Sequence, residues 1–227
     1  MQINRFYADF SHTAVIPKVT SPILHEETLR DQVAGRLKGS AQTDFTNNAQ
    51  TGWELSQTLK RDHAPAEQRY DAWLKPFKYL LTTEDIEADI TKHWARNDSF
   101  EWVIRQIAEM SGHSSANKLP LTFTSGAINP MIQIAMQRYY PDLLKDVASL
   151  NILGVNIEMK NGVFTGNLLP IDPKAYAGCS AFSGEEFLMI GDHFMRPYGF
   201  GDRLIVIYEP DGSCDKDTVM RQLRRYF

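Results

Sequence analysis

The spacing of the apolar residues changes near residue 110, and this change constrains the fold more than any other feature of the sequence. Between residues 53 and 110 the apolar side chains recur every three or four positions, as on one face of a helix. From residue 119 the sequence LPLTFT alternates between apolar and polar or turn-forming residues, as a strand does. We therefore predict an α+β fold, with a helical N-terminal half packed on a mixed C-terminal half that contains a small antiparallel sheet.

The segment GVNIEMKNGVFTGNL, residues 154–168, gives the clearest local prediction. Two alternating runs flank Asn161-Gly162, a dipeptide that supplies the positive-φ residues of a tight hairpin turn. The β-branched segment RLIVIYEPDG, residues 203–212, predicts a further strand that ends in a turn. The spacing of Val219, Leu223 and Phe227 predicts a C-terminal amphipathic helix.

The domain organisation follows from a polar stretch at residues 39–52, GSAQTDFTNNAQTG, which has little to bury and which we interpret as a linker or mobile loop. Residues 1–52 are then an N-terminal arm, one helix entered at Ser21-Pro22, and this linker. Residues 53–227 form a single α+β domain, helical over 53–110 and mixed over 111–227. Within it, Thr82 or Thr83 followed by acidic residues predicts a helix N-terminus.

Charge and cysteine content exclude several classes of function. The formal net charge is −4, from 24 basic and 28 acidic residues, which argues against general nucleic-acid binding. Two widely spaced cysteines cannot form a disulfide framework or a cysteine-rich zinc site, so we expect no metal or other cofactor. We find no apolar run of membrane-span or signal-peptide length. We therefore expect a protein without a membrane span, cytoplasmic or exported without a cleaved signal.

Cys179, in YAGCSAFSGEEF, is the candidate nucleophile. The string Gly178-Cys179-Ser180-Ala181-Phe182-Ser183 resembles the segment that carries the catalytic thiol in papain-like peptidases. The resemblance implies a circularly permuted order, because few residues follow Cys179; His113 would then be the base and His193 its substitute. Alternatively, Ser183 and Glu186 form a capping box that starts a helix after Cys179, which leaves the thiol as a small buried side chain.

A second pattern, Pro141-Asp142 followed by Glu158-Met159-Lys160, resembles the PD…(D/E)xK pattern of metal-dependent nucleases. The resemblance implies two acidic metal ligands and a lysine that orients water. Alternatively, Asp142 opens a helix, while Glu158 and Lys160 are the solvent-facing positions of a strand.

The loop GDHFMRPYGFGDR is the densest group of polar and aromatic residues in the C-terminal half, and we predict a binding surface there. Its candidate contact residues are Asp192, Arg196, Tyr198, Phe200, Asp202 and Arg203. An Asp-His pair such as Asp192-His193 can also bind metal or transfer protons, but we find no second close histidine to complete a metal site. Of the four tryptophans, Trp53 beside the polar stretch is the candidate for an exposed contact.

Two classes of function fit these patterns. The first is a non-catalytic protein of accessory, antagonist or effector type, whose partner is another protein. The second is a thiol hydrolase that uses Cys179 with His113, and a metal-dependent nuclease is a third, more distant reading. A Cys179 sulfur within hydrogen-bond reach of a histidine in an open cleft would favour the thiol hydrolase.

Overall fold

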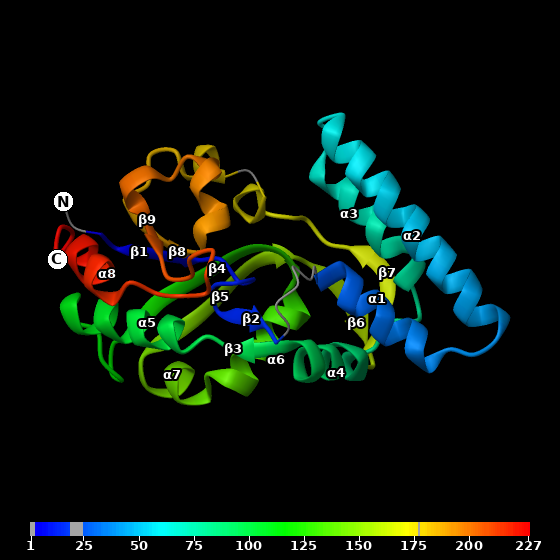
Figure 1. Cartoon of the computed structure of the whole chain (residues 1–227), viewed down its shortest axis with the longest axis horizontal. Helices are drawn as coiled ribbons and strands as arrows, with labels where there is room; N and C mark the ends of the chain where they lie inside the picture. Colours follow the sequence, from blue (N-terminus) through cyan, green and yellow to red (C-terminus); the bar gives the residue numbers. More distant parts are fainter. Residues whose placement is uncertain (1–2, 19–24, 177) are drawn as a thin grey trace.

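A five-stranded parallel sheet forms the centre of the protein (Figure 1). The computed structural model describes residues 3–18, 25–176 and 178–227. The sheet has the order β5-β4-β1-β8-β9. Its strands are β1 (Arg5–Ala8), β4 (Leu119–Ile128), β5 (Ala148–Val155), β8 (Phe187–Gly191) and β9 (Leu204–Val206).

The prediction of an α+β fold with a small antiparallel sheet is therefore wrong. The central strand β1 has only four residues, and it pairs in parallel with β4 and β8. All five residues of β8 are buried. A strand buried on both faces reads as an unbroken apolar run without alternation, which hides it from a search for period two. The predicted capping box is also absent, because Ser183 and Glu186 precede this strand.

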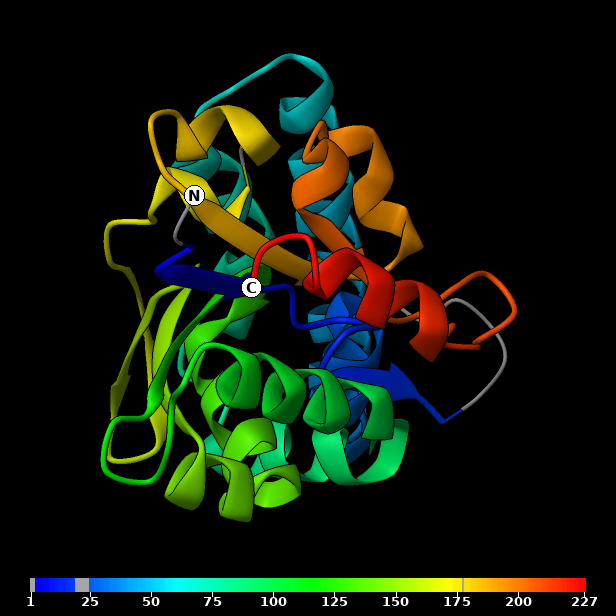
Figure 2. The ribbon, with the colours of Figure 1, turned by 90° about the vertical axis from the view of Figure 1, so that its left-hand side faces the viewer.

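Helices of the core lie together along one side of the sheet (Figure 2). They are α4 (Thr83–His93), α5 (Asp98–Met110), α6 (Asn129–Tyr139) and α7 (Pro141–Asp146). The chain steps from β1 to β4 and from β4 to β5 in one direction, and right-handed crossovers place the connecting helices on the same face. The C-terminal helix α8 (Lys216–Leu223) buries Val219 and Leu223 as predicted, but it ends before Phe227, which is exposed.

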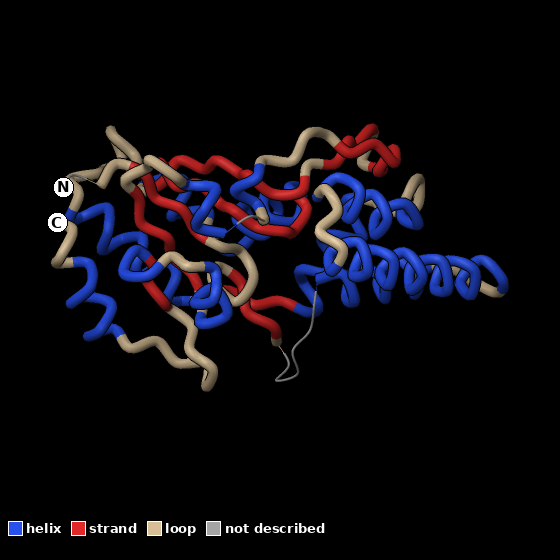
Figure 3. Tube along the Cα trace, turned by 90° about the horizontal axis from the view of Figure 1, so that it is seen from above, coloured by secondary structure: helices blue, strands red, loops and turns tan. Residues whose placement is uncertain are grey.

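A helical cap is inserted after β1. The short strands β2 (Val15–Pro17) and β3 (Trp94–Arg96) pair antiparallel and close the base of this insertion. Between them the chain forms α1 (His25–Arg36), α2 (Ser40–Arg61), α3 (Ala66–Leu74) and the 3-10 turn η1 (Lys75–Phe77), before it returns through α4. Helices α2 and α3 extend beyond the end of the sheet (Figure 3). The predicted helix entry at Ser21-Pro22 lies outside the described residues.

The polar stretch at 39–52 is not a linker; apart from Gly39 it is the first half of α2. The buried residues of α2 are Phe45, Ala49, Gly52 and Ser56, a helical stripe of mostly small side chains. A Cβ added to Gly52 would lie 2.5 Å from the backbone oxygen of Ala72 in α3. The small side chains of this stripe thus let α2 and α3 approach closely. Because the stripe is not strongly hydrophobic, the sequence pattern did not reveal the helix.

The predicted hairpin is confirmed as β6 (Ile157–Lys160) and β7 (Val163–Leu168), which pair antiparallel. Asn161 and Gly162 both have positive φ in its turn. The amide of Tyr79 donates to the Phe164 carbonyl at 2.8 Å, so the hairpin is joined to the end of the cap.

Local helix signals were read correctly in the core. Thr82 caps α4 in a reciprocal capping box with Asp85, and the apolar stripe Phe100, Val103, Ile104 and Ile107 is buried in α5. In the described part of the chain, no helix combines the length and hydropathy needed to cross a membrane.

Candidate active site at the carboxyl edge of the sheet

Two aspartates follow the neighbouring strands β1 and β8, at the point where the strand order of the sheet reverses. From β1 the chain steps to β4 on one side, whereas β8 is followed by β9 on the other side. In an open parallel sheet, a crevice forms at the carboxyl ends of strands where the connections diverge in this way. Asp9 directly follows β1 and Asp192 directly follows β8, so both side chains lie at this crevice.

Asp9 is fixed by the pairing of its own strand. Ala8 is paired with Ile190, and the Asp9 amide donates to the Ile190 carbonyl at 2.9 Å. Burial and the negative charge of Asp192 raise the pKa of Asp9 to about 8, although hydrogen bonds from the Phe10 amide and the Ser125 hydroxyl oppose this shift. The backbone thus holds one carboxyl group next to another in a poorly solvated site.

Asp192 is buried and caps the 3-10 helix η4 (His193–Tyr198) by accepting a hydrogen bond from the Phe194 amide at 2.7 Å. Burial raises the pKa of Asp192 to about 6, although amide hydrogen bonds and His193 oppose this shift. Two converging carboxylates whose ionisation is disfavoured form a site that a cation would stabilise.

The end of β4 supplies hydroxyl groups to the same crevice. The pairing of β4 with β5 is irregular between Thr124 and Ile128, and this irregularity lies at Ser125. The buried Ser125 hydroxyl hydrogen-bonds the Asp9 carboxyl group, and its oxygen accepts from the Ala127 amide at 3.3 Å. Ser125 therefore links Asp9 to the neighbouring strand.

A pocket of about 620 Å³ lies above the two aspartates. Its floor comes from the ends of β1, β4 and β8, and its roof from α2 and α3 of the cap. Cap and core approach closely here, because a Cβ on Gly126 would lie 2.8 Å from the Tyr70 hydroxyl. Aromatic side chains dominate the walls: Trp53, Tyr70, Trp73, Tyr176, Phe194, Tyr198 and Phe200. Trp53, predicted as an exposed contact, is half-buried in this wall.

Lys174, in the 3-10 turn η2 (Pro173–Ala175), brings a cation to the pocket wall. Its Nζ lies 2.5 Å from Glu185 Oε1 and donates to the Tyr7 hydroxyl at 3.2 Å. Despite the opposing effect of burial, hydrogen bonds from Lys174, Tyr7 and Arg5 lower the pKa of Glu185 to about 2. The network keeps Glu185 ionised and holds Lys174 in place beside the pocket.

The cap contributes two further basic residues, Lys60 of α2 and Arg69 of α3, to the lining. The Arg69 guanidinium carbon lies 5.3 Å from the centroid of the Tyr176 ring. Its Nε is buried and makes no hydrogen bond within the described residues. The pocket therefore has acidic groups on its floor and basic groups around its wall and roof.

His12 is the histidine of the described residues that lines this pocket. Its φ of 60° lies in the left-handed region, which is uncommon for a residue with a side chain. The ring packs against Phe194 and Tyr208, with centroids 5.3 and 5.8 Å away. Burial and the charge of His193 lower the pKa of His12, so its neutral form can accept a proton.

The structure does not assemble the predicted thiol site. Cys179 lies in the 3-10 helix η3 (Gly178–Phe182) and packs against a cluster that includes Tyr7, Phe182 and Phe200. Across the described residues, no hydrogen bond joins its sulfur to a histidine. In place of the papain-like helix that the resemblance implied, the described residues of this segment form a short 3-10 helix.

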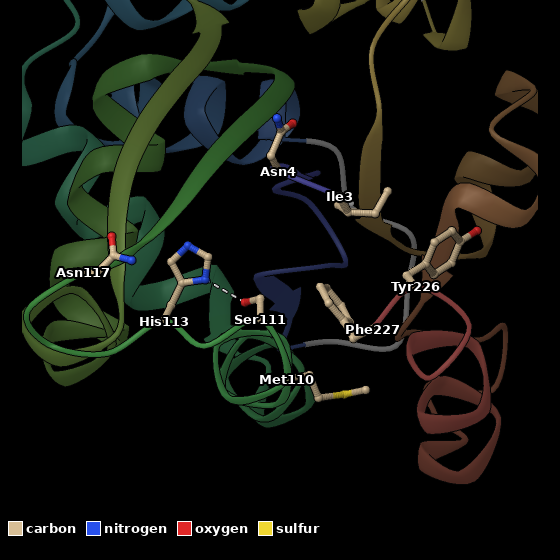
Figure 4. Close-up of a pocket in the computed structure, with 8 residues that line it drawn as sticks. All are labelled: Ile3, Asn4, Met110, Ser111, His113, Asn117, Tyr226 and Phe227. Carbon is tan, nitrogen blue, oxygen red and sulfur yellow. Dashed lines mark hydrogen bonds between the residues drawn. The ribbon is translucent and has the colours of Figure 1, made fainter. Parts of the chain in front are cut away.

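The predicted base His113 lies at the opposite edge of the sheet, before β4 (Figure 4). Its Nδ1 is 2.7 Å from Ser111 Oγ, and its ring meets Phe6 edge-on at a centroid distance of 6.1 Å. His193, the substitute base, places its Nδ1 3.1 Å from the Tyr208 carbonyl oxygen and packs on Phe194.

The nuclease pattern is also divided between separate places. Asp142 is exposed in the first turn of α7. Glu158 lies in the β6–β7 hairpin, where it accepts hydrogen bonds from Thr165 and Asn167 and pairs with Lys160.

The predicted binding loop divides between pocket and surface. Asp192, Tyr198 and Phe200 line the pocket. Arg196 pairs with Glu209 at 2.6 Å, and Arg203 donates to the Glu185 carbonyl at 3.2 Å. Asp202 accepts a bond from the Tyr226 hydroxyl through its backbone oxygen.

Sequence reasoning missed Asp9, Ser125 and Lys174. One signal was present: FYAD and FLMIGD are both apolar runs that end in an aspartate. Two such runs fit parallel strands whose carboxyl ends meet at one edge. The first run was too short to be recognised as a strand.

The parallel sheet with its flanking helices and inserted helical cap is a Rossmann-like α/β fold, which solved structures share. Among solved structures, cytosolic 5′-nucleotidase IIIB bound to cytidine is similar at a TM-score of 0.53 and 10% identity, covering 98% of this chain and 85% of that one. A protein with unknown function from Bordetella pertussis Tohama I has a TM-score of 0.50 at 11% identity, covering 85% and 83% of the two chains. No family model and no curated protein sequence matches the chain.

These findings correct the predicted function. The prediction of a non-catalytic protein of accessory, antagonist or effector type is corrected, because the chain has the α/β fold of a solved cytosolic 5′-nucleotidase. The thiol hydrolase and the metal-dependent nuclease are corrected as well, because the structure leaves their predicted residues apart.

Proposed function

We propose that this protein hydrolyses phosphate monoesters, with Asp9 as the nucleophile. The observation that carries the proposal is the convergence of Asp9 and Asp192 at the carboxyl ends of two adjacent parallel strands, beneath a capped pocket. The fold it shares with a cytosolic 5′-nucleotidase supports the same reaction class.

The acidic pair fits a divalent cation such as Mg²⁺. Mg²⁺ is commonly bound through one or two carboxylates together with substrate phosphate oxygens. The raised pKa values of Asp9 and Asp192 fit this role, because a cation between them would relieve the cost of ionising both groups. When bound, the ion would neutralise charge on the phosphoryl oxygens.

The carboxylate of Asp9 attacks phosphorus, and the bond from phosphorus to the ester oxygen breaks. The leaving group departs with the bonding pair and takes a proton from solvent, which leaves an acyl phosphate on Asp9. Lys174, held beside the pocket by Glu185 and Tyr7, attracts the phosphoryl oxygens.

Water then attacks the acyl phosphate. His12 accepts the proton of this water in its neutral form, since burial lowers its pKa. The bond between phosphorus and the Asp9 oxygen breaks, which releases inorganic phosphate and restores the carboxylate.

Hydrolysis of phenyl phosphate in the presence of Mg²⁺, measured through the release of phenol, tests the proposal. We expect turnover by the wild type and a labelled acyl phosphate after an acid quench, and neither signal with Asp9→Asn. In His12→Ala the acyl phosphate should accumulate, because its breakdown is slowed. Undiminished turnover by Asp9→Asn would refute the proposal.

A further inference from the structure

Arg69 and Lys60 give the roof of the pocket positive charge that is not required to balance the acidic groups of the floor. One divalent cation would balance the two floor carboxylates, and Lys174 pairs with Glu185, which also pairs with Arg5. Arg69 and Lys60 form no ion pair among the described residues. A buried, unpartnered guanidinium N–H is costly, and an anionic ligand would satisfy it.

Arg69 is also shaped for such a ligand. The Tyr176 ring supports its guanidinium group at 5.3 Å, which limits the directions in which the planar fork can point. Arg69 and Lys60 belong to α3 and α2, whereas Asp9 and Asp192 belong to the strand ends below. The basic pair and the acidic pair therefore lie on opposite walls of the pocket.

We propose that the substrate is a phosphate monoester whose leaving group carries a second anionic group, a carboxylate or a second phosphate, bound by Arg69 with Lys60. This inference rests on the proposed hydrolase function. The phosphoryl group that is transferred lies at the floor, and the second anion lies under the cap. Aromatic walls between the two ends suit a flat or apolar body.

Matched substrates test this second anion directly. Phenyl phosphate and 4-phosphonooxybenzoate share one ring and one ester, and only the latter carries a carboxylate; 1,4-phenylene bisphosphate tests the phosphate form. With Mg²⁺ we expect kcat/KM to be about 10- to 100-fold higher than for phenyl phosphate for one or both esters that carry a second anion, as for a charge-assisted hydrogen bond. The preferred ester identifies the second group.

Arg69→Gln should remove this preference through KM, so that kcat/KM for the esters with a second anion falls toward the value for phenyl phosphate. Arg61→Gln is the matched control, because Arg61 is an exposed arginine at the end of α2 in the same cap, and its guanidinium group donates a hydrogen bond to the Thr58 hydroxyl. Calorimetry provides a readout without turnover. 4-Phosphonobenzoate should bind more tightly than phenylphosphonate, and this difference in affinity should disappear in Arg69→Gln.

Each outcome separates the two proposals. Equal turnover of all three esters by the wild type would overturn the anion subsite and leave the hydrolase proposal standing. An equal loss for every ester in Arg69→Gln would also overturn it, because Arg69 would then bind the transferred phosphoryl group. Absence of any turnover would overturn the hydrolase proposal and the subsite with it.

Discussion

Two pockets of similar volume lie at opposite edges of one sheet. The pocket at the carboxyl edge holds about 620 Å³ and the pocket at the amino edge about 540 Å³. The first collects Asp9, Asp192 and three basic residues, whereas the second is lined by His113 and mainly apolar or uncharged groups (Figure 4). Pocket size does not separate the two. The difference arises because diverging connections open a crevice only where the strands end.

Among substitutions at the two pockets, Asp9→Asn should have the largest effect on turnover. We expect kcat/KM for phenyl phosphate to fall by at least about 10³-fold, because the nucleophile is lost. The folded protein should remain as stable as before or more so, because a buried acid next to Asp192 has been neutralised. Steady-state kinetics and thermal denaturation measure both effects.

The free energy of unfolding should depend on pH through the carboxyl edge. The pKa values of Asp9 and Asp192, about 8 and about 6, lie above the 3.8 of the free side chain. The folded state therefore binds more protons than the unfolded state between about pH 4 and pH 8, and stability should fall as the pH rises through this window. Without Mg²⁺ we expect a loss on the order of 1–3 kcal/mol between pH 5 and pH 8.

Denaturation by urea at the two pH values, with and without Mg²⁺, checks this dependence. Added Mg²⁺ should restore stability at pH 8 more than at pH 5, since the cation binds the ionised pair. Asp9→Asn should flatten the pH slope, whereas His113→Ala should not. An unchanged slope in Asp9→Asn would show that other groups cause it.

Gly126→Ala tests the closeness of cap and core. The added Cβ would lie 2.8 Å from the Tyr70 hydroxyl, so Tyr70 and α3 must shift. We expect KM to rise by roughly threefold to tenfold, in line with the cost of overpacking. Tyr70→Phe in the same chain should recover part of the loss by removing the contacted oxygen. A KM unchanged in the single variant would mean that the cap adjusts freely.

The smallest effect should come from His113→Ala at the amino edge. The variant loses the hydrogen bond to Ser111 and the edge contact with Phe6, so the free energy of unfolding should fall by about 1 kcal/mol. Turnover of phenyl phosphate should stay within about twofold of the wild type. A large loss of turnover would place His113 in the reaction and remove the contrast between the edges.

Local elements could be read from the sequence because their signals are local. The Asn161-Gly162 turn, the Thr82 cap and the apolar stripe of α5 each depend on residues within a few positions of one another. Asp192 was also singled out, because its loop is dense in polar and aromatic residues. Its partner Asp9 was not, because it follows a strand of four residues.

The sequence by itself determined where most core helices and the β6–β7 hairpin form. Tertiary structure decided the strand order, because parallel pairing joins residues far apart in the chain, as Ala8 with Ile190. That pairing brings Asp9 to Asp192, and the insertion of α2 and α3 places Arg69 above them. Neither the approach of Asp9 to Asp192 nor the position of Arg69 above them is encoded in a short sequence pattern, since both depend on burying strands and cap helices against the same core.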